Sequence, residues 1–206
     1  MSIVTVSKRI VLSFFCYLLW LYPVVAQPDA AQWTWLQGDS SLTTLRREQF
    51  GNWGQRGVAA AANLPSARSR AVSWSDAAGN TWIFGGNGFD SAGNNGLLND
   101  LWRYTPATKQ WTWVSGSAVV NSIASFGTRA VPAASNQPGA RQTAVGWTDA
   151  AGNLWLFSGF GVAANANQGV LNDLWRFQPA TGLWTWMGGS NIINAGGAFG
   201  TQGVAA

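Results

Sequence analysis

The stretch LNDLWRYTPATKQWTW at residues 98–113 returns as LNDLWRFQPATGLWTW at residues 171–186. Each residue of the first copy stands 73 positions before its counterpart, as 98 stands before 171. A third, partial copy, WTW, occupies residues 33–35. A fixed period of this kind indicates a repeated supersecondary unit, because each copy must be built and packed in the same way.

The repeat continues on both sides of this stretch. Residues 65–113 and 138–186 are identical at 29 of 49 positions. PSAR at 65–68 returns as PGAR at 138–141, DAAGN at 76–80 as 149–153, and TWIFGG at 81–86 as LWLFSG at 154–159. The connection between copies also recurs, with Phe-Gly pairs at 50–51, 126–127 and 199–200, and with QRGVA at 55–59 resembling QGVA at 202–205.

Alternating and β-branched or aromatic residues predict short strands within each copy. In the first copy the predicted strands cover residues 71–75, 81–86, 98–104 and 110–114, and a further strand is expected at residues 32–36. Asp, Gly and Asn at 76–80 and Pro at 106 are typical of tight turns, whereas 87–96 is expected to be a Gly/Asn loop. Four short strands repeated at a fixed interval predict one blade of a β-propeller. A β-sandwich is the alternative, but it gives no reason for the period.

These motifs resemble the kelch repeat. A strand ends in Gly-Gly, an aromatic residue stands at Tyr104 or Phe177, and a tryptophan follows seven positions later at Trp111 or Trp184. The longer pattern is similar to extended bacterial kelch repeats related to the galactose-oxidase-type propeller. The resemblance covers residues 32–206. Ser158 departs from it, replacing the first glycine of the pair in the second copy, and we expect slightly looser packing there.

The N-terminus has the pattern of a secretory signal peptide. Lys8 and Arg9 precede an apolar run over residues 10–25, and Ala26 is a small residue at a plausible cleavage point. The alternative is an uncleaved membrane anchor, for which the run is short. We therefore expect a secreted, periplasmic or cell-surface protein with no membrane span once the signal is removed.

The composition excludes several classes of chemistry. Removing Lys8 and Arg9 lowers the net charge from +4 to +2, and no basic patch suggests nucleic acid. The chain has no histidine, and its single cysteine, Cys16, leaves with the signal. The resemblance implies relatives that include copper oxidases, which need histidine, tyrosine and cysteine around the metal; without histidine and cysteine in the mature chain, that activity is excluded. We expect no cofactor, no metal and no catalytic set.

The meander predicts where a ligand would bind. The turns at 76–80 and 106–108 share one end of the sheet, and the longer, variable loops share the other, which is the usual place for binding residues. Four charged residues that recur with the period also belong to that long-loop end: Arg68, Asp100, Arg141 and Asp173. They are either salt bridges rebuilt in every blade, which we favour, or a ring of charges facing a ligand.

Charged residues that do not repeat are the better candidates for ligand contacts. These non-repeating residues are Arg46, Arg47, Glu48, Arg70, Asp90 and Lys109, and the candidates taken from them are Arg46, Arg47, Arg70 and Asp90. The sequence around Asp90 has oxygen donors suited to calcium, but its counterpart at 163–168 has no carboxylate. Rim tryptophans are suited to stacking on sugar rings, although most of them are expected to pack between blades.

The sequence thus predicts an all-β, kelch-type β-propeller segment with two complete four-stranded antiparallel blades and an orphan fourth strand. Its parts are the signal peptide (1–26), a latch strand and long connection (27–64), blade 1 (65–137) and blade 2 with an incomplete connection (138–206). The latch strand is the orphan fourth strand at residues 32–36, which is expected to complete the last blade of a closed ring and so join it to the first. Since closed propellers have four to eight blades, we expect a fragment of a larger ring whose remaining blades lie in missing C-terminal sequence. The expected function is a binding module for a protein or glycan ligand on the long-loop end. The alternative is a non-catalytic segment of a carbohydrate-active propeller enzyme of sugar or sialic-acid type.

Overall fold

The computed structural model describes residues 50–197 and 200–202, which all belong to one compact unit, Gly38–Ala206. The predicted signal peptide, the predicted strand at 32–36, and Arg46 and Arg47 lie outside the described residues. The idea that Trp33 and Trp35 belong to a latch strand stays a prediction for the same reason.

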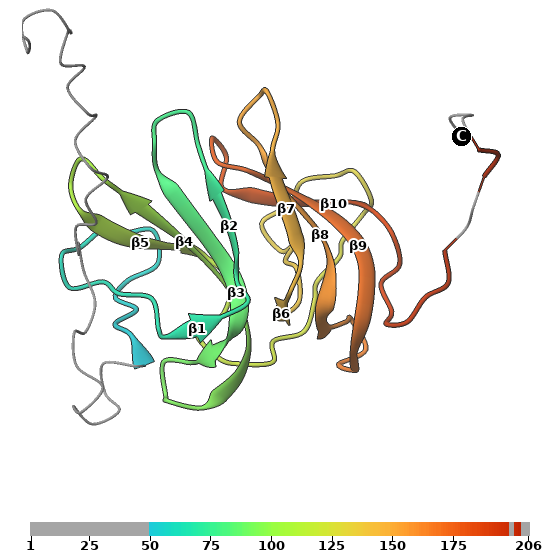
Figure 1. Cartoon of the computed structure of the whole chain (residues 1–206), viewed down its shortest axis with the longest axis horizontal. Helices are drawn as coiled ribbons and strands as arrows, with labels where there is room; N and C mark the ends of the chain where they lie inside the picture. Colours follow the sequence, from blue (N-terminus) through green and yellow to red (C-terminus); the bar gives the residue numbers. More distant parts are fainter. Residues whose placement is uncertain (1–49, 198–199, 203–206) are drawn as a thin grey trace, which may run out of the picture. The chain divides into compact units, whose positions relative to one another are not determined.

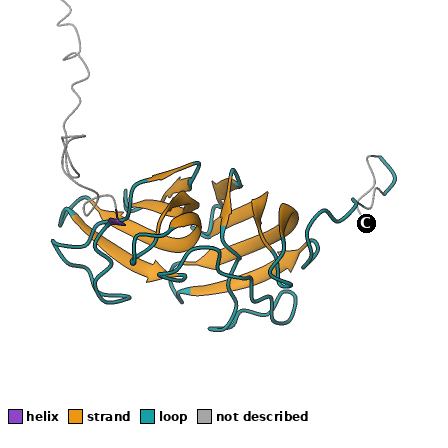
Figure 2. Ribbon diagram, turned by 90° about the horizontal axis from the view of Figure 1, so that it is seen from below, coloured by secondary structure: helices purple, strands orange, loops and turns teal. Residues whose placement is uncertain are grey.

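The described residues form two antiparallel sheets and no α-helix; Phe50 lies in a 3₁₀ turn (Figures 1 and 2). Sheet 1 consists of β1 (Arg68–Ser69), β2 (Val72–Ser75), β3 (Thr81–Phe89), β4 (Asn95–Thr105) and β5 (Gln110–Ser115). Sheet 2 consists of β6 (Arg141–Gln142), β7 (Val145–Thr148), β8 (Leu154–Val162), β9 (Gln168–Gln178) and β10 (Leu183–Gly188). The predicted all-β class and the antiparallel order are therefore confirmed.

The first strand of each sheet is interrupted. Both β1 and β2 pair with β3, and both β6 and β7 pair with β8, so each sheet has four strands in chain order. The interruption falls at Arg70 and at its counterpart Thr143, which have φ angles of 58° and 57°. This left-handed backbone breaks the ladder, since few non-glycine residues adopt it inside a regular strand.

The two central strands are longer than the sequence predicts, and the loop between them is shorter. β3 continues past the glycine pair to Phe89, and β4 begins at Asn95, which leaves residues 90–94 as the loop. The glycine pair does not end the strand, because it forms a bulge: the register shifts between Phe84 and Gly86, and again between Phe157 and Gly159. Ser158 has the same φ of 63° as Gly85.

Most of the apolar core lies between the two sheets. One side of sheet 1 supplies Val72, Trp74, Trp82, Phe84 and Leu101, and sheet 2 supplies Leu154, Leu156, Trp175, Phe177 and Trp184. Aromatic contacts join them, with 5.6 Å between the ring centroids of Phe84 and Trp184 and 5.8 Å between those of Trp82 and Phe177. The two sheets are therefore joined by an interior of large side chains.

The connection before each sheet packs on the sheet that follows it. Ala60 bridges Trp111 in β5, and Ala133, 73 positions later, bridges Trp184 in β10. Trp53 packs edge-on against Trp102, and Phe126 takes the same place against Trp175. These pairs correct one alignment made from the sequence, because the counterpart of residues 126–127 is 53–54 and not the Phe-Gly pair at 50–51.

Among the described residues, no helix is long and apolar enough to cross a membrane.

Candidate functional site

The long loops meet at one end of each sheet. In sheet 1 the β3–β4 loop contacts the segment after β5: Ser91 donates a backbone bond of 3.1 Å to the carbonyl of Ala118 and a hydroxyl bond of 2.9 Å to the same oxygen. In sheet 2 the amide of Ala164 donates to the carbonyl of Asn191 at 3.2 Å. These contacts bring the β3–β4 and β8–β9 loops together with the segments that follow β5 and β10, as the meander predicts. We call the β3–β4 loop, the β8–β9 loop and the segments that follow β5 and β10 the loop end.

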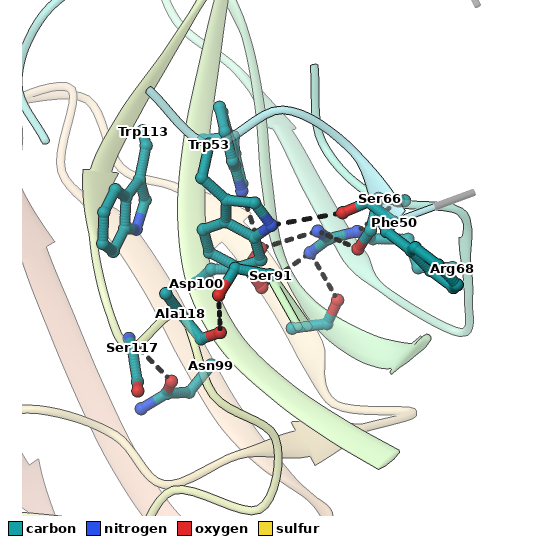
Figure 3. Close-up of polar contacts among 12 residues, drawn as sticks. Phe50, Trp53, Ser66, Arg68, Ser91, Asn99, Asp100, Trp113, Ser117 and Ala118 are labelled. Atoms are coloured by element: carbon teal, nitrogen blue, oxygen red, sulfur yellow. Dashed lines mark hydrogen bonds and ion pairs between the residues drawn. The ribbon is translucent and has the colours of Figure 1, made fainter. Parts of the chain in front are cut away.

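A buried ion pair supports the loop end of sheet 1 (Figure 3). Arg68 donates two hydrogen bonds to Asp100, of 2.7 and 2.6 Å, in a bidentate arrangement. Its remaining donors reach the carbonyls of Ser66 and Gly85 and the hydroxyl of Ser66, and the indole of Trp102 donates to Asp100 at 2.6 Å. All the charge is satisfied internally, as a buried pair requires.

Sheet 2 repeats this arrangement. Arg141 donates to the two oxygens of Asp173 at 2.6 and 2.7 Å, and to the carbonyls of Gly139 and Ser158 at 3.1 Å. The side chains of Arg141 and Asp173 are 1% and 0% exposed. The structure thus contains the two Arg–Asp pairs that the sequence favours, and both lie inside the protein.

Asp90 is also used inside the loop end. It is fully buried, and it accepts bonds from the amides of Ala92 and Asn94 at 2.9 and 2.8 Å and from the amide of Val120 at 3.3 Å. Burial raises the pKa of Asp90, but hydrogen bonds from the Asn94 side chain and from these amides outweigh it and hold that pKa below its ordinary value. The carboxylate fixes the loop and is not exposed, which corrects the prediction that Asp90 contacts a ligand.

Arg70 lies elsewhere, at the seam between the first strands of the two sheets. Its carbonyl accepts a 3.0 Å bond from the amide of Thr143, and its exposed guanidinium reaches the side-chain oxygen of Gln142 at 3.4 Å. The sequence places a charge here in one copy only. In the structure that charge is exposed and has one long hydrogen bond, which leaves donors for a ligand.

The opposite end of the sheets carries the tight turns. Asp149 accepts bonds from the side chains of Asn153 and Trp155, both at 2.8 Å, and these lower its pKa to about 2. Asp76 accepts the same set from Asn80 and Trp82; burial raises the pKa of Asp76, yet the hydrogen bonds outweigh it and lower that pKa. Both aspartates stabilise turns, as the sequence predicts.

Sequence reasoning did not identify the asparagines that hold the loops. Asn63 donates to the carbonyls of Val58 and Trp111 at 2.8 and 3.0 Å, and Asn136 does the same with Val131 and Trp184. The two asparagines lie 73 residues apart, which marks them as equivalent positions of the repeat. The alignment of Phe126 with Phe50 hides this equivalence, and the alignment of Phe126 with Trp53 shows it.

The exposed side chains of the loop end are mostly amides and a hydroxyl: Ser91, Asn94, Asn95, Asn165, Asn167 and Gln168. Val119 and Ile192 stand at equivalent exposed positions beside them. Over residues 50–197 and 200–202, no three His, Cys, Asp or Glu side chains are grouped so as to hold a metal ion. The chemistry that the loop end offers is hydrogen bonding with a few apolar contacts.

Comparison with known proteins gives a limited result. No protein-family model matches the chain, and no curated protein matches it. Among solved structures, one described as "Structure of YjhT" is similar over 63% of this chain and 40% of its own length, with 19% sequence identity and a TM-score of 0.44.

Proposed function

We propose that this chain is a segment of a kelch-type β-propeller that acts outside the cytoplasm as a binding module. The ligand is a protein or a glycan, and it contacts the loop end together with Arg70 at the seam. The extracytoplasmic location rests on the signal-like sequence at 1–26, and the propeller assignment rests on the repeat and its resemblance to kelch motifs. Two consecutive four-stranded sheets packed face to face support that assignment.

One observation carries the proposal: the repeated charges are paired inside, while the exposed polar side chains of the β3–β4 and β8–β9 loops are neutral hydrogen-bonding groups and Arg70 is exposed at the seam. Arg68, Asp100, Arg141 and Asp173 are occupied by one another and by backbone carbonyls. A rigid scaffold with exposed amide donors and acceptors is suited to binding, because its loops need little ordering when a ligand arrives.

The test is a glycan array and a protein-capture screen with the purified chain, followed by affinity measurements on variants. Asn95→Ala, Gln168→Ala and Arg70→Ala should each weaken binding, and Arg70→Ala by about tenfold if its guanidinium bonds the ligand. Lys109→Ala is the matched control, because Lys109 is an exposed cation in the tight turn at the opposite end. Equal losses for Arg70→Ala and Lys109→Ala would contradict a site at the loop end and seam, and turnover of a bound sugar would contradict a purely binding role.

A further inference from the structure

The outer side of sheet 2 has the same side chains as the buried side of sheet 1. Val145, Trp147, Trp155, Phe157 and Leu174 stand 73 positions after Val72, Trp74, Trp82, Phe84 and Leu101, and all five pairs are identical. The exposures differ: Val72, Trp74 and Phe84 are 7%, 4% and 1% exposed, whereas Val145, Trp147 and Phe157 are 59%, 43% and 41% exposed. We call the five residues of sheet 2 the outer face of sheet 2.

The structure also shows what covers such a face. In sheet 1 it is covered by Leu154, Leu156, Trp175, Phe177 and Trp184 of sheet 2. Their counterparts in sheet 1 are Thr81, Ile83, Trp102, Tyr104 and Trp111, which we call the outer face of sheet 1. On this face Trp102 and Tyr104 are already buried by the chain itself. Ile83 and Trp111 are only partly buried, although Leu156 and Trp184 at the same places in sheet 2 are fully buried.

Hydrogen bonds accompany the apolar contact between the sheets, and besides the 3.4 Å bond from the Arg70 guanidinium to the side chain of Gln142, three of them join groups that recur in the repeat. The amide of Thr143 donates to the carbonyl of Arg70 at 3.0 Å, the indole of Trp74 donates to the carbonyl of Trp155 at 3.0 Å, and the hydroxyl of Thr148 donates to the carbonyl of Ser75 at 3.2 Å. The equivalent positions of the repeat carry counterparts of the groups in these three bonds, whereas the Arg70 guanidinium has none, because Thr143 stands at that place. The donors are the amide of Arg70, the indole of Trp147 and the hydroxyl of Ser75. Their acceptors, in the same order, are the carbonyls of Thr143, Trp82 and Thr148.

We propose that the outer face of sheet 2 docks on the outer face of sheet 1 of a second copy of this chain. Sheet 1 of the second copy then packs on sheet 2 of the first copy in the same way that sheet 2 packs on sheet 1 within one chain. The two faces are different, so the contact is head-to-tail, and each copy keeps one of each face available for further association. This surface is distinct from the loop end, and the proposal does not depend on the ligand proposed there.

Two serines limit how closely the copies approach. Where sheet 1 meets sheet 2, a Cβ at Gly85 would lie 2.6 Å from the carbonyl of Arg141, and one at Gly146 would lie 2.5 Å from the side chain of Val72. On the outer faces these positions are Ser158 and Ser73. Each serine forces the opposing chain to shift, so the contact between copies is looser than the contact between the two sheets of one chain.

Sedimentation velocity on the full chain over a wide range of concentrations tests the proposal. The chain should associate as its concentration rises. Phe157→Glu and Ile83→Glu each place a charge on one of the two faces, and either variant alone should associate about tenfold more weakly or worse. An equimolar mixture of the two variants should form a 1:1 dimer, because each variant retains the face that the other has lost. The double variant Ser73→Gly, Ser158→Gly should associate about tenfold more tightly than the original chain.

Several outcomes would overturn the proposal. A monomer at every concentration, in the original chain and in the double glycine variant alike, rules out docking between copies. Association lost in Phe157→Glu but kept in Ile83→Glu indicates a symmetric contact through sheet 2 alone, and association kept in both variants arises from another part of the chain. A saccharide or an unrelated protein bound to the face in place of a second copy would also contradict it. Circular dichroism must show that each variant is folded; Phe157→Ser and Ile83→Ser replace any glutamate variant that is not.

Discussion

At the scale of single residues, the two Arg–Asp pairs decide how the loop end is held. Each arginine uses both terminal nitrogens on one carboxylate and donates further bonds to backbone carbonyls, and Arg68 donates one more to the Ser66 hydroxyl. The arginines thereby tie β1 to the bulge in β3 and β6 to the bulge in β8. Such a pair adds little net stability by itself, because desolvation offsets the attraction. Removing one member is costly, however, since the other is then buried and unpaired.

Arg141→Ala should therefore lower the free energy of unfolding by about 3–5 kcal/mol. The reason is that Asp173 would remain fully buried with one indole donor and no counter-charge. Urea unfolding measures the change. Arg129→Ala is the control, because Arg129 is exposed and makes one 3.0 Å bond to a carbonyl. A loss below about 1 kcal/mol for Arg141→Ala would show that the pair is not structural.

Asp149 gives a pH dependence at the same scale. Its pKa is lowered to about 2 from 3.8, so the folded state holds the carboxylate ionised more strongly than the unfolded state does. The stability from Asp149 is then fully present above about pH 4 and is lost as the pH falls through the folded pKa near 2. The difference in melting temperature between the original chain and Asp149→Asn should shrink steadily between pH 4 and pH 2. A constant difference over that range would contradict the assignment.

At the scale of elements, the bulge in β3 shows why one position requires glycine and its counterpart does not. Gly85 has a positive φ, and its missing Cβ leaves room for the carbonyl of Arg141. Ser158 has the same backbone, but no described sheet lies against it, and its hydroxyl donates to the carbonyl of Leu171 at 2.7 Å. The bulge around Ser158 therefore has the same backbone as the bulge around Gly85. The two positions differ because the side of sheet 2 that carries Ser158 is exposed.

Gly85→Ala should lower stability by about 1–3 kcal/mol, because the new methyl group overpacks a close contact with backbone in a left-handed conformation. Ser158→Ala should cost less, about 1 kcal/mol, since it removes one hydrogen bond at a half-exposed site. Thermal unfolding of both variants at low protein concentration compares them. The order of the two effects is the test, and a larger loss for Ser158→Ala would contradict the steric explanation.

The elements also show what the sequence can and cannot predict. The four strands of each sheet and the pairing of Arg68 with Asp100 follow from the period, because identical residues at a fixed interval must make the same contacts. The interruption at Arg70 does not follow, since neither Arg70 nor Thr143 is a residue typical of left-handed backbone. The burial of Asp90 was missed because one of its partners, the amide of Val120, comes from a segment 30 residues away. The alignment of the connections was wrong because the counterpart of Phe126 is a tryptophan, Trp53, while a phenylalanine stands nearby at residue 50.

At the scale of the whole molecule, the described residues form one unit because their largest side chains lie between the sheets. That core includes side chains from both sheets and from the connection between them, as Phe126 packs on Trp175 and Trp186. Neither sheet covers these residues alone. We therefore expect the two sheets to unfold in a single transition, since opening the contact exposes apolar area on both at once.

A matched pair of phenylalanines measures how much of the stability this contact provides. Phe84 and Phe157 occupy equivalent positions, but Phe84 is 1% exposed between the sheets and Phe157 is 41% exposed on the outer face of sheet 2. Phe84→Ala should lower the free energy of unfolding by about 3–5 kcal/mol, because it leaves a cavity beside Trp184. Phe157→Ala should cost about 1 kcal/mol or less at protein concentrations where the chain is monomeric, since little area is buried there. Strand propensity is lost equally in both variants, so the difference between them isolates the packing of one sheet on the other. Equal losses in the two variants would mean that Phe157 is covered in the monomer, and the outer face of sheet 2 would then not be open.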